Sequence, residues 1–250
     1  MRVLQKILSG AALFLSLSAA QAEEVLVAVS ANFTGAARAI ALQFEQQTGH
    51  TLKISYGSTG KLYAQIVNGA PYEVFLAADS KHPGKAEASG LAVLGSRFTY
   101  AKGRLVLWSA DAAEFENGED YLRQMKYLRL AIANPKTAPY GLAAKQVLQH
   151  LALWDDLQKK VVRGDSIAQT FQFLVSGNAQ AGFVAYSLVN QWRGQKGSLW
   201  IIPEDYYQPV VQQAVLLNKG LKNPAAQAFM AFLHSPKARA IISDFGYGIE

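Results

Sequence analysis

Four short turns place small hydroxyl or amide residues where a predicted strand gives way to a predicted helix. They are Ser30-Ala31-Asn32, Gly57-Ser58-Thr59-Gly60, Pro139-Tyr140-Gly141 and Gly164-Asp165-Ser166-Ile167. The first backbone N–H groups of a helix lack intrahelical acceptors, and the helix dipole is positive at that end. A small anion held by hydrogen bonds is therefore the chemistry that these turns favour.

Each turn taken alone is also typical of ordinary structure, because Ser, Thr and Asn are common N-cap residues and Gly is common in turns. The anion-binding interpretation depends on the four turns meeting at one place. In an α/β fold the carboxyl ends of parallel strands lie on one edge of the sheet, where ligands bind. We therefore expect the turns to converge on one cleft.

The sequence supports a catalytic site or a metal site less well than it supports an anion-binding site. The four histidines, His50, His82, His150 and His234, lie on separate segments without metal-ligand spacing. The sequence has no G-x-S-x-G elbow to activate Ser30 or Ser58, and Gly57 to Lys61 (GSTGK) lacks the spacing of a phosphate loop. The carboxylate pairs Asp155-Asp156 and Glu204-Asp205 are typical of solvated helix starts. We predict a protein that is not an enzyme and binds no metal cation directly.

The elements that must position the turns alternate between strands and helices. Apolar runs rich in β-branched residues predict buried strands, and helical spacing of apolar residues predicts helices between them. This alternation predicts parallel sheets covered by helices. The predicted strands are 25–29, 51–55, 72–77, 105–108, 128–133, 161–162, 181–185 and 210–217, and the predicted helices include 62–67, 142–151, 167–174, 224–233 and 236–245.

The regular alternation of strands and helices is interrupted at Tyr100 to Gly103, and a second series of strands and helices begins there. If the C-terminal elements dock back on the first series, the protein has two α/β lobes with a ligand cleft between them. We predict lobe I at residues 23–102 plus 209–250 and lobe II at residues 103–208.

The N-terminus has the order of a secretory signal peptide. Arg2 and Lys6 precede an apolar run, and Ala20-Gln21-Ala22 forms a small-residue cleavage site, so we predict a signal peptide at residues 1–22. The alternative, a membrane anchor, is disfavoured because the apolar run is shorter than the roughly 20 residues that span a bilayer. Cleavage leaves 22 Lys plus Arg against 18 Asp plus Glu, an excess that suits anions. Export and the lack of a run of adjacent basic residues exclude nucleic acid as a partner, and the predicted location is the periplasm.

Several motifs together resemble the periplasmic molybdate-binding proteins of ABC importers, the ModA family. They run through the chain from the first predicted strand to the 181–184 segment. The motifs are residues 27–34 (VAVSANFT), 58–75 (STGKLYAQIVNGAPYEVF), 77–79 (AAD), 133–135 (ANP), 138–141 (APYG) and 181–184 (AGFV).

The resemblance implies a type II periplasmic binding-protein fold, whose two lobes close over a tetrahedral oxyanion, molybdate or tungstate. It implies that no cofactor is needed and that the partner is a membrane ABC permease docked transiently. We expect a monomer, because a protein that closes over its ligand must let its lobes move freely. In one branch of the family a ligand-contacting tyrosine follows the Gly-x-Val strand, where this sequence has Ala185 followed by Tyr186. The ligand-binding residues that the resemblance implies here are Ala31, Asn32, Ser58, Thr59, Tyr140 and Ile167.

A cleft that offers only hydrogen-bond donors selects its anion. Phosphate at neutral pH retains a proton that needs an acceptor, and an unpaired buried donor costs roughly 1–3 kcal/mol. Molybdate, tungstate and sulfate carry no such proton, and cavity size must then separate sulfate from the larger anions. The alternatives are a sulfate-binding protein, a binding protein for another solute such as an iron chelate, an anion sensor, and a secreted hydrolase on the same fold.

Overall fold

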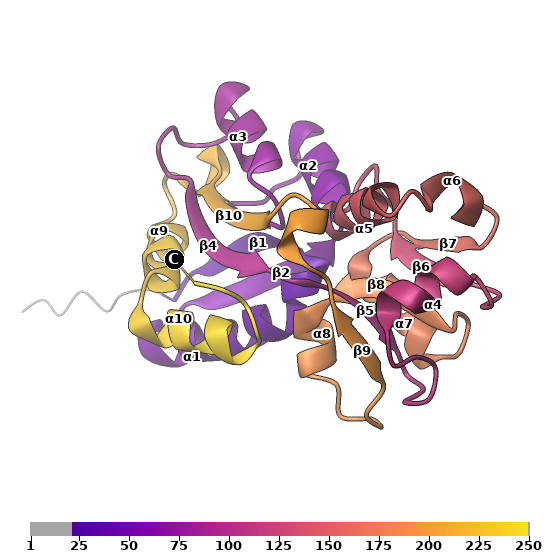
Figure 1. Cartoon of the computed structure of the whole chain (residues 1–250). Helices are drawn as coiled ribbons and strands as arrows, with labels where there is room; N and C mark the ends of the chain where they lie inside the picture. The colour runs from indigo at the N-terminus through magenta and orange to yellow at the C-terminus, as the bar shows by residue number, and fades with distance from the viewer. Residues whose placement is uncertain (1–21, 250) are drawn as a thin grey trace, which may run out of the picture.

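The computed structural model describes residues 22–249 and contains two five-stranded mixed sheets, each with helices packed against it (Figure 1). The predicted class, α/β with two lobes, is confirmed. We use lobe I and lobe II below for the ranges defined above. Residues 1–21 of the predicted signal peptide lie outside the described residues.

The sheet of lobe I has the strand order β2-β1-β3-β10-β4. Strand β1 lies between β2 and β3 and pairs in parallel with both, and its Val25, Val27 and Val29 are fully buried. Strand β10 returns from the far end of the chain and runs antiparallel to β3 and β4. The strands are β1 (Glu24–Ser30), β2 (Thr51–Gly57), β3 (Val74–Ala77), β4 (Phe98–Gly103) and β10 (Val210–Leu216).

Helices cover both faces of this sheet (Figure 1). Helices α1 and α10 lie together on one side, whereas α2 and α3 lie together on the other. The helices of lobe I are α1 (Thr34–Thr48), α2 (Thr59–Val67), α3 (Lys81–Ala88), α9 (Pro224–Leu233) and α10 (Pro236–Asp244), with the short 3-10 helices η1 (Ala31–Phe33) and η3 (Asn218–Gly220).

The sheet of lobe II has the order β7-β6-β8-β5-β9, in which β7, β6 and β8 are parallel and β5 runs antiparallel to both of its neighbours, β8 and β9. Its strands are β5 (Leu105–Ser109), β6 (Leu130–Ala133), β7 (Val161–Gly164), β8 (Ala181–Ala185) and β9 (Ser198–Ile201). Its helices are α4 (Gly118–Gln124), α5 (Pro139–His150), α6 (Trp154–Leu157), α7 (Ile167–Val175), α8 (Tyr186–Asn190) and the 3-10 helix η2 (Glu204–Tyr206).

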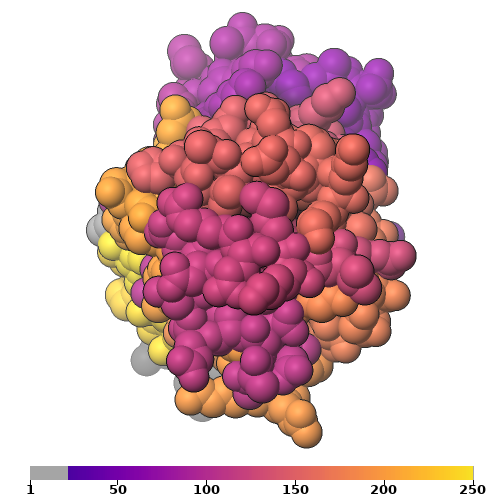
Figure 2. Space-filling model, turned by 45° about the vertical axis from the view of Figure 1, so that its right-hand side comes forward, coloured from indigo at the N-terminus to yellow at the C-terminus, as the bar shows by residue number. Residues whose placement is uncertain are grey.

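The chain passes between the sheets twice, from β4 into β5 at Arg104 and from β9 back to β10 through residues 202–209. The parallel pairing expected from the alternation holds for β1 to β3 and for β6 to β8, whereas the strands next to these crossings run antiparallel to their neighbours. In the space-filling view lobe II comes forward and meets the first part of the chain along its upper edge (Figure 2). Among the described residues no helix has the length and apolar character needed to cross a membrane.

Candidate functional site

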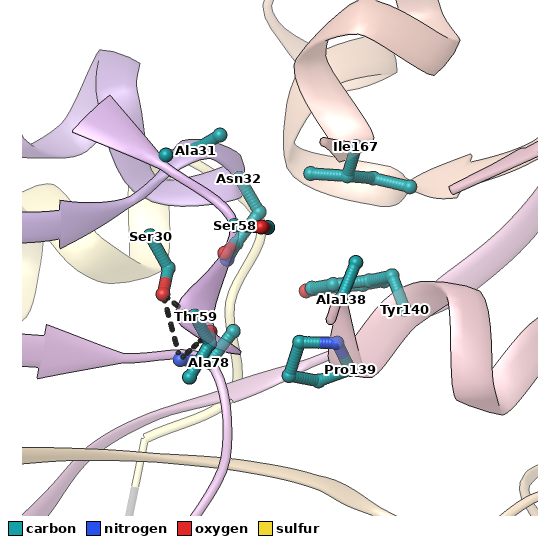
Figure 3. Close-up of a pocket in the computed structure, with 11 residues that line it drawn as sticks. Ser30, Ala31, Asn32, Ser58, Thr59, Ala78, Ala138, Pro139, Tyr140 and Ile167 are labelled. Carbon is teal, nitrogen blue, oxygen red and sulfur yellow. Dashed lines mark hydrogen bonds between the residues drawn. The ribbon is translucent and has the colours of Figure 1, made fainter. Parts of the chain in front are cut away.

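The four turns meet in one pocket between the lobes, and all six residues predicted to bind the ligand line it (Figure 3). Its volume is about 10 Å³, far below the roughly 300–1,000 Å³ of pockets for drug-sized molecules. The pocket therefore has no room for a molecule of that size. The lining residues are Ser30, Ala31, Asn32, Gly57, Ser58, Thr59, Ala78, Ala138, Pro139, Tyr140 and Ile167.

Helix starts from both lobes supply the polar character of this pocket. On the lobe I side, η1 begins at Ala31 and α2 begins at Thr59, while on the lobe II side α5 begins at Pro139 and α7 at Ile167. The initial N–H groups of these helices need acceptors from outside the helix. Since two lobes contribute such groups to one small space, the pocket suits a negatively charged ligand.

Two lining residues, Tyr140 and Ser58, carry a buried hydroxyl without a hydrogen-bond partner, and Ser58 is the one in lobe I. It occupies the N-cap position of α2 but makes no capping hydrogen bond. Its Oγ is buried and has no hydrogen-bond partner, and the residue is only 4% exposed. Buried polar groups normally have partners. The Ser58 side chain therefore does not cap α2 in this structure, which leaves its hydroxyl without a partner at the pocket.

Ser30 and Thr59 form a hydroxyl pair beside Ser58 (Figure 3). Their Oγ atoms lie 2.6 Å apart, and the N–H of Ala78 donates to both, at 3.0 and 3.1 Å. One hydroxyl must donate to the other, which leaves one O–H proton of the pair free. The pair can thus give the pocket a single O–H donor in addition to the hydroxyl of Ser58.

The Asn32 side chain makes hydrogen bonds within the protein. Its Nδ2 donates to Gln212 Oε1 at 2.6 Å and to the Tyr247 hydroxyl at 3.1 Å. The Tyr247 hydroxyl in turn donates to the Asn32 carbonyl at 2.7 Å. Because both amide protons have acceptors, Asn32 can serve a ligand through its backbone N–H, while its side chain fixes the turn to β10 and to the C-terminal segment.

Tyr140 contributes from lobe II through the start of α5. Its phenol points toward lobe I (Figure 3) and lies against Gly103, at the point where the chain first crosses between the lobes. Gly141 lets the helix approach β6, because a Cβ there would collide with the Ala133 carbonyl. This close packing fixes the backbone N–H of Tyr140 at the pocket.

Burial keeps the interior tyrosines protonated. It raises the pKa of Tyr100 and of Tyr140 well above the usual value, and it also raises the pKa of Tyr247. An iron site of the kind considered above needs converging phenolates together with a carboxylate or a His, and the residues that line the pocket include neither a carboxylate nor a His. The adjacent tyrosines Tyr206 and Tyr207 also have hydrogen-bond partners within the protein. Tyr206 donates to Glu119 Oε2, and the Tyr207 hydroxyl accepts from the Leu105 N–H.

Charge is absent from the side chains that line the pocket, since its residues are small, apolar, hydroxyl, amide or phenol in type. Tyr186 does not line it. Instead, its ring lies 4.5 Å from the Arg104 guanidinium carbon. The pocket can therefore stabilise an anion by oriented dipoles and hydroxyl donors in place of a counter-ion.

The four histidines each have a local structural contact. His82 Nδ1 lies 2.7 Å from Asp79 Oδ2, and the rings of His50, His150 and His234 pack on aromatic neighbours. Within residues 22–249 no group of three or more His, Asp or Glu side chains is placed to hold a metal ion. Neither Ser58 nor Ser30 has a hydrogen-bonded His or carboxylate to act as its base among these residues.

Five lining residues were not among the predicted ligand-binding set: Ser30, Gly57, Ala78, Ala138 and Pro139. Ser30, Gly57 and Pro139 belong to turns that the sequence analysis had singled out. Ala78 follows β3 as the other turns follow their strands, but it has no polar side chain to mark it. Its position at the carboxyl end of a predicted strand is the feature of the sequence that could have identified Ala78 as a lining residue.

The chain is similar to known proteins over nearly its whole length. Residues 25–248 match the family model described as bacterial extracellular solute-binding protein. The molybdate-binding protein ModA of Azotobacter vinelandii is 52% identical over 233 residues, which cover 93% of this chain and 92% of that protein. The molybdate-binding protein ModA of Rhodobacter capsulatus is 48% identical over 231 residues, covering 92% and 90%. A solved structure of an Azotobacter vinelandii periplasmic molybdate-binding protein has a TM-score of 0.87 and 45% identity, covering 90% of this chain and 99% of that one.

Proposed function

Because the chain belongs to the bacterial extracellular solute-binding proteins, and among them to the ModA molybdate-binding proteins, we propose that its pocket captures molybdate or tungstate for an ABC importer. The observation that carries the proposal is the unpartnered, buried hydroxyl of Ser58 in an uncharged pocket lined by helix starts of both lobes. It is a binding protein and not an enzyme.

In the proposed complex, the anion accepts hydrogen bonds from backbone N–H groups of Ala31, Asn32, Ser58 and Thr59 in lobe I. Lobe II adds the N–H groups of Tyr140 and Ile167, which is why the anion binds most tightly when the lobes are closed. The hydroxyl of Ser58 and one O–H of the Ser30 and Thr59 pair complete the set. A charge-assisted hydrogen bond contributes about 1.5–3 kcal/mol, so several such bonds hold a dianion without a cation.

Selectivity follows from the same donors. The lining residues include no carboxylate that could accept the remaining proton of phosphate, whereas molybdate, tungstate and sulfate need none. The size of the closed cavity then separates molybdate and tungstate from the smaller sulfate. A general carrier of tetrahedral dianions that includes sulfate is the second candidate, because the donor set itself suits either size.

The remaining parts of the proposal concern transport. We propose that residues 1–22 are cleaved on export, that the mature monomer works in the periplasm, and that its closed form docks transiently on a membrane permease. Both lobes must reach the permease in the closed arrangement, which favours a monomer whose lobes move freely.

Thermal unfolding of the anion-free mature protein tests the proposed ligand. Equal concentrations of molybdate, tungstate, sulfate and phosphate are compared, since a ligand that binds only the folded state adds about 2.7 kcal/mol at 100 times its Kd. We expect large shifts with molybdate and tungstate only. An equal shift with sulfate would favour the general carrier, and the lack of any shift would refute the proposal.

A further inference from the structure

Two contacts join the lobes directly beside the anion pocket. The Gly60 N–H of α2 in lobe I donates to the Thr137 carbonyl of lobe II at 2.8 Å. One residue further along α2, Lys61 Nζ lies 2.9 Å from Asp165 Oδ2 of lobe II. Gly60 follows Thr59, and Asp165 lies two residues before Ile167, so both contacts adjoin residues that line the pocket.

Glycine at position 60 permits this approach. A Cβ there would lie 3.1 Å from both the Cα and the carbonyl oxygen of Thr137, closer than nine in ten real Cβ contacts, so the facing backbone would have to shift. The obstacle is backbone of the opposite lobe, which cannot turn aside as a flexible side chain would. The lack of a side chain at Gly60 therefore sets how closely the lobes meet at this edge of the pocket.

The ion pair lies at the outer rim. The Lys61 and Asp165 side chains are 50% and 72% exposed, so the pair is in contact with solvent while it bridges the lobes. The covalent crossings at Arg104 and at residues 202–209 do not hold this rim together. If the lobes part, both the Gly60 bond and the ion pair must break.

We propose that Gly60, Lys61, Thr137 and Asp165 form a clasp that holds the lobes closed over the anion and sets the rate at which the anion leaves. This inference depends on the proposed function, because the clasp acts on the same pocket. The four residues are positioning residues: Gly60 and Lys61 donate to Thr137 and Asp165, and none of the four contacts the ligand in this proposal.

The expected effect is modest and has a definite sign. An exposed ion pair changes the equilibrium between the closed and open lobes about two- to five-fold, and salt screens the attraction between the two charges. Because the pair forms as the lobes close, its loss should accelerate release and leave the encounter of anion and open protein unchanged. Lys61→Met and Asp165→Asn should therefore each raise the release rate about two- to five-fold at low salt.

The main competing explanation is that Lys61 attracts the anion electrostatically. In that case removing a positive charge and removing a negative charge must have opposite effects, chiefly on the association rate. The clasp predicts the same effect for both substitutions, on release. The Asp165→Asn variant thus separates the two explanations. The clasp predicts faster release of the anion, as in Lys61→Met, whereas electrostatic attraction predicts a change in association opposite to that in Lys61→Met.

The experiment measures release of radiolabelled molybdate from the full mature protein into an excess of unlabelled molybdate, with association measured in parallel. Lys53→Met is the matched control, since Lys53 pairs with Glu24 at 3.7 Å on the surface of lobe I alone and is similarly exposed. The double exchange Lys61→Asp with Asp165→Lys should restore slow release. Gly60→Ala, which obstructs closure, should accelerate release more than either charge variant.

Faster release in both charge variants, its disappearance at high salt and its reversal by the exchange would support the clasp. Unchanged release in Lys61→Met, or opposite effects of the two charge variants, would overturn it. A parent protein that does not bind molybdate would instead refute the proposed function.

Discussion

Replacing Ser58 with alanine should separate anion binding from folding. The Ser58 hydroxyl is buried, lines the pocket and makes no hydrogen bond to the described chain. The substitution therefore removes no hydrogen bond from the anion-free protein. In the complex, however, it removes an O–H donor to a dianion.

The two expected magnitudes differ accordingly. Loss of one charge-assisted hydrogen bond costs about 1.5–3 kcal/mol of binding free energy, or roughly a 10- to 150-fold rise in Kd for molybdate. The anion-free protein loses only a few atoms that had no polar partner, and burying an unpaired hydroxyl is itself unfavourable. Its unfolding free energy should stay within about 0.5 kcal/mol of the parent or rise.

Isothermal titration with molybdate and denaturant unfolding without anion measure the two quantities. Ser235→Ala is the matched control, because Ser235 caps α10 by accepting from the Ala238 N–H at 3.2 Å. We expect it to lower the unfolding free energy by ~1 kcal/mol and leave the affinity unchanged. The reasoning is refuted if Ser58→Ala binds molybdate as tightly as the parent, or if it destabilises the free protein as the Ser235 variant does.

Three further results are expected. Asn32→Ala should lower the unfolding free energy by ~1–3 kcal/mol, because it leaves the buried oxygen of Gln212 without its 2.6 Å donor; unchanged denaturant midpoints would contradict this. Gly141→Ala should cost ~1–3 kcal/mol of stability and weaken molybdate binding, since its Cβ meets the Ala133 carbonyl and displaces the start of α5; parent-like calorimetric titration would contradict it. Above pH about 10, the unfolded chain releases phenolic protons that the native state retains, so stability should fall by up to roughly 1.4 kcal/mol per pH unit for each tyrosine whose pKa burial raises. Denaturant midpoints that stay flat from pH 9 to 11 would contradict the burial of Tyr100, Tyr140 and Tyr247.

The position of each turn at the end of a strand could be predicted because it depends on local patterns, and the α/β fold class then implies that the turns converge. The run Val25 to Val29 predicts a buried strand, and a small polar turn followed by helical spacing predicts where its carboxyl end lies. Similar patterns place Ser58 and Tyr140 after other predicted strands. Resemblance to a known family then selected the residues of these turns that face the ligand.

Other features depend on partners that are distant in sequence. The amide of Asn32 is held by Gln212, 180 residues away, so its engagement within the protein could not be seen in the first turn alone. Strand β4 was missed because Lys102 and Gly103 interrupt its apolar pattern. Ala78 was missed because its contribution to the pocket comes from the backbone and not from a polar side chain.

The most direct test is a crystal structure of the mature protein with molybdate. Our account predicts the anion between the lobes, its oxygens within hydrogen-bond distance of backbone N–H groups at Ala31, Asn32, Ser58, Thr59, Tyr140 and Ile167, and of Ser58 Oγ. No Lys or Arg side chain should touch it. Molybdate held by a cationic side chain, or bound outside this pocket, would contradict the account.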